Sequence, residues 1–157
     1  MNASSNYLLK VDIKKAYDYV KWEFLGEILQ ALNFPDKLIL WVMTCVTTAS
    51  FSLSINGNLE GFFHGKRGLR QGDIMPPLPF VICMEYLSRI LKMVGEHKSS
   101  SFHSKCRCLK FNHLVFADDL ILFSKVDKSF VVMLMRILAT FAFASGLVAN
   151  NDGKSNI

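Results

Sequence analysis

Three aspartates stand in positions that suit metal-dependent chemistry. Asp118 and Asp119 are adjacent acids inside an otherwise apolar stretch, and Asp12 follows a short apolar run near the N-terminus. Burying an unpaired carboxylate is unfavourable unless a cation or hydrogen-bond donors satisfy it. An Asp-Asp pair by itself is commonly a solvated hairpin turn. Asp12 changes that interpretation, because a fold that sets the two strands side by side would gather three acids.

Three gathered carboxylates call for divalent cations. Hard oxygen ligands select Mg²⁺ or Mn²⁺. Two such ions about 4 Å apart can activate an attacking hydroxyl and stabilise the leaving oxygens in phosphoryl transfer. Protein groups then mostly position the reactants and neutralise charge. The hypothesis requires residue 12 and residues 118–119 to lie on adjoining strands.

The elements that must position these acids begin with a strand over residues 8–13, where Lys10 and Asp12 interrupt an apolar run. From Trp22 the apolar positions recur at helical spacing, and Asn33 with Pro35 ends that helix. A second helix is predicted over residues 36–47. Its inward side chains are expected to be Leu38, Ile39, Trp41, Val42 and Cys45.

A hairpin follows, because Asn56-Gly57 between alternating apolar residues is a strong signal for a type I′ turn. Its return strand, residues 59–64, leads into a basic, glycine-containing loop over residues 66–73. The next helix is expected to end near Gly95. Because Pro79 disfavours helical geometry at Leu78, that helix is predicted to begin near Pro79 rather than at Pro77.

Two apolar runs, residues 109–117 and 120–123, read as strands hinged on Asp118-Asp119. Asp127 or Ser129 can cap a last helix that runs to about Ser145, and Gly146 is placed to end it in the left-handed conformation. Strand, two helices, hairpin, helix, hairpin and helix together predict an α+β fold. In that fold an antiparallel sheet has its helices packed on one face.

Composition suits one globular domain with a net positive charge. The chain has 157 residues, 51% of them hydrophobic, which suits a single core. Its net charge of +5 favours a polyanionic partner but is equally consistent with an ordinary basic surface. The residues before the first strand carry no signal-peptide pattern, so we expect an intracellular location, in the nucleus or the cytoplasm.

Two other interpretations remain open. A zinc cluster could use the four residues His103, Cys106, Cys108 and His113, but Cys-x-Cys is tighter than the usual structural spacing, and a strand with incidental thiols is favoured. Residues 77–95 and 131–149 approach the length of a membrane span. Because Arg136 and Ser145-Gly146 interrupt the second stretch, it is interpreted as a buried amphipathic helix, and no membrane partner is expected.

The motifs resemble the reverse transcriptases of non-LTR (LINE-type) retrotransposons. Leu9 to Asp18, with Trp22, looks like the first palm motif of that family. Arg67 to Asp73 looks like the second, and Phe116-Ala117-Asp118-Asp119 like the signature hairpin of the third. Order and spacing agree over nearly the whole chain. The resemblance therefore implies a polymerase palm-like sheet and an RNA-directed DNA polymerase activity.

The resemblance also implies site residues. Asp12 and Asp118 would be catalytic and would hold two Mg²⁺ or Mn²⁺ ions, with the Ile13 backbone carbonyl assisting and Asp119 supporting. Nucleotide contacts would come from Tyr17, which matches the aromatic residue that closes off the sugar 2′ position, and from Gln71, Gly72 and Lys154. Nucleic-acid contacts would come from Arg67 and Arg70. The partners implied are an RNA template, a DNA primer and deoxynucleoside triphosphates.

The resemblance covers a palm and little else. Residues 1–157 are expected to form a single partial reverse transcriptase domain in which the fingers and thumb of a parent polyprotein are largely missing. The isolated chain is accordingly expected to show little or no turnover, because a primer-template duplex is held through many phosphate contacts. The alternative is a non-catalytic nucleic-acid-binding or inert remnant that keeps the fold, the product of a truncated or degenerate element copy.

Overall fold

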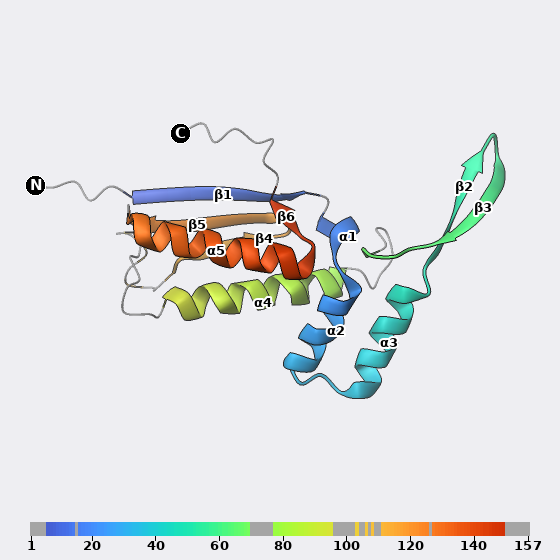
Figure 1. The fold of residues 1–157 in the computed structure, drawn as a ribbon, viewed down its shortest axis with the longest axis horizontal. Coiled ribbons are helices and arrows are strands. Elements are labelled where there is room, and N and C mark those ends of the chain that lie inside the picture. The colour runs from blue at the N-terminus through green and yellow to red at the C-terminus, as the bar shows by residue number, and fades with distance from the viewer. Residues whose placement is uncertain are drawn as a thin grey trace, which may run out of the picture.

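A four-stranded antiparallel sheet carries the fold, with the strand order β4-β5-β1-β6 (Figure 1). The computed structural model describes residues 6–14, 16–69, 77–95, 103, 106, 108, 111–125 and 127–149. The strands are β1 (Asn6–Lys14), β4 (His113–Phe116), β5 (Asp119–Lys125) and β6 (Val148–Ala149). β1 and β5 lie in the middle of this sheet, so the predicted neighbourhood of the two acidic strands is confirmed.

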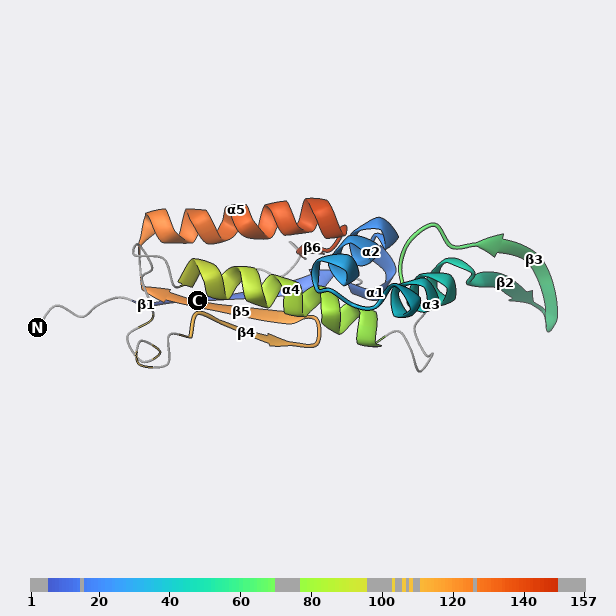
Figure 2. The same ribbon diagram turned by 90° about the horizontal axis from the view of Figure 1, so that it is seen from below.

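Two long helices, α4 (Pro77–Gly95) and α5 (Lys128–Ser145), cover one face of the sheet (Figures 1 and 2). Side chains alternate between the two faces of a strand. Ile13, Leu120 and Leu122 are accordingly buried beneath the helices, whereas Lys10 and Asp12 are exposed on the opposite face. The predicted α+β arrangement, with helices on one face, is confirmed.

Three further helices and a hairpin lie at one end of the sheet. They are α1 (Ala16–Tyr19), α2 (Trp22–Ala31), α3 (Asp36–Thr47), β2 (Ser50–Ile55) and β3 (Asn58–His64). The β2–β3 hairpin projects away from the sheet (Figure 1). Asn56 and Gly57 have φ values of 51° and 85°, as the predicted type I′ turn requires.

The start of α4 differs from the prediction. The helix begins at Pro77 and runs without interruption through Leu78 and Pro79. A proline in the first turn removes an N–H group that has no intrahelical acceptor there in any case, and its fixed φ suits a helix. The restriction that Pro79 places on Leu78 is therefore tolerated at this position, and the expectation of a late start was wrong.

The inward face of α3 was predicted only in part. Val42 is buried and Leu38 and Ile39 are partly buried, but Trp41 is 56% exposed and Cys45 is also exposed. The helix packs on α2 through a face that includes Met43 and Val46, with Trp41 turned outward. Because α3 is apolar nearly all round, spacing alone could not decide which side faces the core.

The ends of α5 agree with the sequence. Asp127 caps the helix by accepting a hydrogen bond from the Ser129 backbone N–H at 3.0 Å, and Gly146 ends it with φ of 80°. Among the described residues, α5 is the one helix long and apolar enough to cross a membrane, by length and composition alone. A mostly buried core helix meets the same criterion, but only 22% of α5 is buried, through residues that include Phe130, Leu134 and Phe141, so the prediction of a buried helix is confirmed only in part.

Candidate active site

The antiparallel register of β1 and β5 brings the three acids to one place. Asp12 lies directly opposite Asp119, and the Ile13 backbone N–H donates to the Asp118 carbonyl at 3.1 Å. Asp118 stands in the tight turn between β4 and β5, after Ala117, whose φ is 52°. The observed turn therefore lies one residue earlier than the predicted hinge at Asp118-Asp119, because Asp119 is the first residue of β5.

All three acids can be reached from the open face of the sheet. Asp12 and Asp118 are exposed, and Asp119 is half-buried. The Lys10 ammonium lies 3.0 Å from a carboxylate oxygen of Asp119. This hydrogen bond, followed by the charges of Asp119, Asp12 and Asp118, raises the pKa of Lys10. The Lys10 ammonium thus already occupies part of the space around these carboxylates.

The backbone brings the acids together, but their side chains do not form a closed cluster. Within the described ranges, no three His, Cys, Asp or Glu side chains are arranged to hold a metal ion. The donor set still fits Mg²⁺ or Mn²⁺, since it consists of exposed, hard carboxylate oxygens on adjoining strands. Asp119 would need to exchange the Lys10 ammonium for a metal ion.

The structure does not support the zinc cluster considered from the sequence. His103, Cys106, Cys108 and His113 are all described, and they do not gather as ligands. The ring of His103 lies against Phe123, with 6.4 Å between centroids. His113 is committed to a hydrogen-bond network in the core.

Tyr17 lies on α1, just after the acidic end of β1. Its ring is 4.7 Å from that of Phe80, a buried residue of α4, and its backbone carbonyl accepts from the Leu69 N–H at 2.7 Å. The basic loop therefore reaches the turn that carries Tyr17. The Arg67 guanidinium stacks over the Tyr19 ring at 4.6 Å, so part of its charge surface is already covered.

Four predicted contact residues, Arg70, Gln71, Gly72 and Lys154, lie outside the described residues. Their nucleotide and nucleic-acid roles stay predictions.

The family is decided by a match over nearly the whole chain. The model of the family described as reverse transcriptase (RNA-dependent DNA polymerase) matches residues 1–156. The chain belongs to the reverse transcriptase family. The resemblance to non-LTR retrotransposon enzymes is confirmed by curated relatives, which are polyproteins of R2 retrotransposable elements.

One such relative is the Pol polyprotein of the type-2 retrotransposable element R2DM of Drosophila melanogaster, 29% identical over 148 residues. Another is the Pol polyprotein of an R2 element of Popillia japonica, 27% identical over 120 residues. These alignments cover 94% and 76% of the chain but only 13% and 19% of the relatives. The reverse transcriptase chain thus spans less than a fifth of their length.

Solved telomerase structures share the fold. Telomerase from Candida tropicalis, in complex with a fragment of telomeric RNA, superposes with a TM-score of 0.71 at 16% identity. The match covers 96% of the reverse transcriptase chain and 26% of the telomerase chain. Together with the antiparallel sheet and its one-sided helices, this similarity confirms the palm-like fold.

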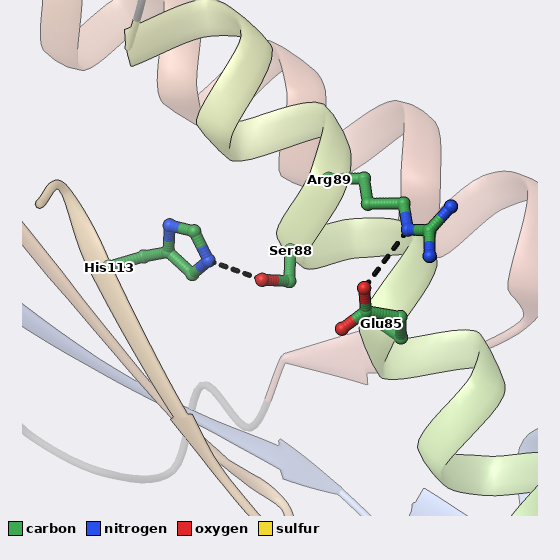
Figure 3. Close-up of polar contacts among 4 residues, drawn as sticks. All are labelled: Glu85, Ser88, Arg89 and His113. Carbon is green, nitrogen blue, oxygen red and sulfur yellow. Dashed lines mark hydrogen bonds and ion pairs between the residues drawn. The ribbon is translucent and has the colours of Figure 1, made fainter.

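Sequence reasoning missed a polar network that ties the reverse transcriptase sheet to α4 (Figure 3). His113 Nε2 lies 2.7 Å from Ser88 Oγ, as Figure 3 shows. His113 Nδ1 lies 2.6 Å from Asn112 Oδ1. The Asn112 amide donates to the Leu91 carbonyl at 2.6 Å. Arg89 and Glu85 pair on the outer side of the same helix. Asn112 and His113 lie in an apolar stretch, and only the adjacency of two polar side chains there could have indicated them.

Lys10 was also missed as a partner of the site. It stands two residues before Asp12 on one strand, so the two side chains must share a face. That spacing was visible in the sequence and could have indicated that Lys10 lies near the acids, but the ion pair with Asp119 depends on the register of β1 against β5.

Proposed function

We propose that the chain is the palm of an RNA-directed DNA polymerase, a reverse transcriptase that copies RNA by two-metal nucleotidyl transfer. The observation that carries the proposal is the register in which Asp12 faces Asp119, with Asp118 in the adjoining turn. Membership of the reverse transcriptase family supports the same conclusion.

In this proposal Asp12 and Asp118 hold two Mg²⁺ or Mn²⁺ ions, the Ile13 backbone carbonyl assists, and Asp119 supports the pair. When bound, such ions activate the primer hydroxyl and neutralise charge on the triphosphate. The chain's own contribution is to hold hard oxygens on adjoining strands of the sheet. In this proposal the nucleic acid would lie against the exposed face that carries Lys10 and Asp12. The ion pair of Lys10 with Asp119 supports the affinity of this site for cations.

Nucleotide and strand contacts complete the proposal. Tyr17 would limit the space at the sugar 2′ position of a deoxynucleoside triphosphate, with Gln71, Gly72 and Lys154 as further nucleotide contacts. Arg67 and Arg70 would contact phosphates of the RNA template or DNA primer, and the net charge of +5 supports a polyanionic partner. The proposed setting is inside the cell.

Metal binding tests the proposal without requiring efficient turnover by the chain. We expect Mn²⁺ titration followed by electron paramagnetic resonance to show two sites per chain. Asp12→Asn or Asp118→Asn should each weaken binding at least about tenfold, because each substitution removes a charged ligand. Asp36→Asn, at the start of α3, is the matched control and should leave binding unchanged.

Single-nucleotide incorporation on an RNA-templated DNA primer, with the chain in excess, tests the chemistry. Incorporation should depend on Mg²⁺ or Mn²⁺ and fall at least about 100-fold in Asp118→Asn, since lost metal stabilisation is worth several tenfold factors in rate. Measurable incorporation that is equal in the wild type and Asp118→Asn would exclude the mechanism. Salt-dependent RNA binding without metal binding would indicate a non-catalytic nucleic-acid-binding protein instead.

A further inference from the structure

Trp22, the first residue of α2, joins two segments that are distant in sequence. Its indole N–H donates to the Gly68 backbone carbonyl at 2.8 Å. Its ring also lies beside Gly65, where an added Cβ would meet the ring at 3.5 Å and the Phe51 ring at 3.3 Å. One aromatic side chain therefore contacts both the base of the β2–β3 hairpin and the loop that follows it.

The same loop is bonded to the turn that carries Tyr17. The Leu69 N–H donates to the Tyr17 carbonyl at 2.7 Å, and the Gly68 N–H donates to the Val20 carbonyl at 2.8 Å. Gly68 has φ of 87°, and a Cβ there would lie only 2.6 Å from the Asp18 carbonyl oxygen. The loop therefore approaches this turn more closely than a residue with a side chain would allow.

The opposite side of the turn is held by the end of α5. The Lys21 N–H donates to the Ser145 carbonyl at 2.9 Å, and the Lys21 ammonium donates to the Phe143 carbonyl at 2.7 Å. The turn is thus fixed to the end of α5, and Gly65–Leu69 is fixed to the turn.

We infer that Trp22 is a positioning residue: its indole holds the Gly65–Leu69 segment on the turn that carries Tyr17 and so sets Tyr17 relative to the nucleotide sugar. This inference rests on the proposed function. Loss of the indole N–H loosens the Gly65–Leu69 segment and reduces the discrimination between ribonucleoside and deoxyribonucleoside triphosphates. Trp22 itself does not contact the nucleotide.

Amide hydrogen exchange measured by NMR tests the anchoring. In Trp22→Phe the amides of Gly68 and Leu69 should exchange about tenfold faster, because one hydrogen bond is worth roughly a factor of ten in an opening equilibrium. The Lys21 amide, which is bonded to Ser145, should keep its rate. Trp41→Phe is the matched control, since Trp41 is the exposed tryptophan of α3 and should change none of these rates.

Nucleotide selectivity tests the positioning. With Mn²⁺ present, the ratio of the dissociation constants of UTP and dUTP should fall at least about threefold in Trp22→Phe, in line with a partly lost hydrogen bond. Trp22→His, whose Nε2–H can replace the indole donor, should restore at least half of that loss. A role confined to stability would lower the melting temperature and leave this ratio unchanged.

The outcomes separate the inference from the function on which it rests. Unchanged exchange at Gly68 and Leu69 in Trp22→Phe would overturn the inference, as would an unchanged selectivity ratio in a protein that binds both nucleotides. If the wild type binds neither Mn²⁺ nor nucleotide, the proposed function fails. The exchange rates then decide alone whether Trp22 anchors the loop.

Discussion

Lys10 places a positive charge among carboxylates that are proposed to bind metal. Its ammonium is 3.0 Å from Asp119, and both side chains are partly open to solvent, at 59% and 38% exposure. An ion pair so exposed is weak, so a divalent ion can displace it. If the proposed metal site is correct, Lys10 would therefore compete with metal for Asp119 and would leave when an ion binds.

Replacing this lysine should strengthen metal binding. In Lys10→Met we expect Mn²⁺ affinity to rise roughly two- to fivefold, the range set by a solvent-exposed ion pair. Electron paramagnetic resonance titration measures the change. Lys92→Met, at the end of α4, is the matched control and should have no effect. An unchanged affinity in Lys10→Met would mean that the ammonium does not compete with metal.

His113 makes stability depend on pH. Burial is the main cause that lowers its pKa from the ordinary value of 6.5, while the nearby Glu85 acts in the opposite direction. The folded protein therefore resists a proton that the unfolded chain accepts. Stability is highest above pH 6.5 and is lost as pH falls below that value, down to the lowered folded pKa. Neutral His113 can donate from Nδ1 to Asn112 and accept at Nε2 from Ser88.

Urea denaturation between about pH 7.5 and 5.5 should show this loss, with a limiting slope of about 1.4 kcal/mol per pH unit from one histidine. His113→Gln should have lower stability at neutral pH and a flatter pH dependence. His64→Gln, on the exposed end of β3, should keep the wild-type slope. Parallel curves for the wild type and His113→Gln would contradict the assignment.

At the scale of single residues, the sequence predicted the acids but not their partners. Asp12, Asp118 and Asp119 stood out because acids are unfavourable in apolar runs. The bond from Trp22 to Gly68 spans 46 positions of the chain, and no local pattern encodes it. The pairing of Lys10 with Asp119 depends likewise on the register between two strands.

Substitutions at Gly57 and Gly146 measure two effects separately, the strain of a positive φ and the steric crowding of an added Cβ. Gly57 and Gly146 have φ values of 85° and 80°, but nothing lies within 4 Å of a Cβ on Gly57. A Cβ on Gly146 would lie 2.4 Å from the Tyr19 carbonyl oxygen. Gly57→Ala should therefore lose about 1 kcal/mol of unfolding free energy from φ alone. Gly146→Ala should lose at least about 2 to 3 kcal/mol, because the end of α5 must also move away from the turn.

Urea denaturation of both variants gives the comparison. Equal losses would show that the end of α5 yields without resistance, and the described packing against Tyr19 and Lys21 would then contribute little to stability.

At the scale of elements, boundaries with local chemistry were predicted well. Asn56-Gly57, Asp127 and Gly146 each mark a turn or a cap through their own conformational preferences. The start of α4 was missed because the restriction that Pro79 places on the preceding residue, Leu78, was expected to exclude helical geometry there, whereas the helix continues through it. The short elements α1 and β6 were not predicted, since β6 exists only through pairing with Ile13 and Lys14.

For the whole molecule, charge should govern RNA binding. With a net charge of +5, affinity for single-stranded RNA should fall at least about tenfold between roughly 50 and 200 mM salt, and fluorescence anisotropy can measure it. Arg67→Gln should reduce the salt slope by about 0.7, the contribution of one phosphate contact. Arg89→Gln is the control, because Arg89 pairs with Glu85 on α4. A slope unchanged by Arg67→Gln would remove Arg67 from the interface.

The overall architecture could be predicted because the motifs occur in the order that a palm requires. In β1, Lys10 and Asp12 alternate with Val11 and Ile13, which indicates one strand face toward the helices and one toward solvent. β5 shows no such alternation, because it is apolar on both faces. The projection of the β2–β3 hairpin could not be predicted, because its exposed Phe62 and Leu59 look like core residues in the sequence. Exposure depends on what packs nearby, which local patterns do not specify.

The register of β1 against β5 decides on which face of the sheet the Asp12 carboxylate lies. Adding one residue to β1 before Asp12 while keeping the pairing of the preceding residues would turn the Asp12 carboxylate toward the helices. The same addition at the tip of the β2–β3 hairpin would only lengthen a loop. A one-residue insertion should therefore abolish the proposed metal binding when it is made in β1 and be harmless when it is made at the tip of the β2–β3 hairpin.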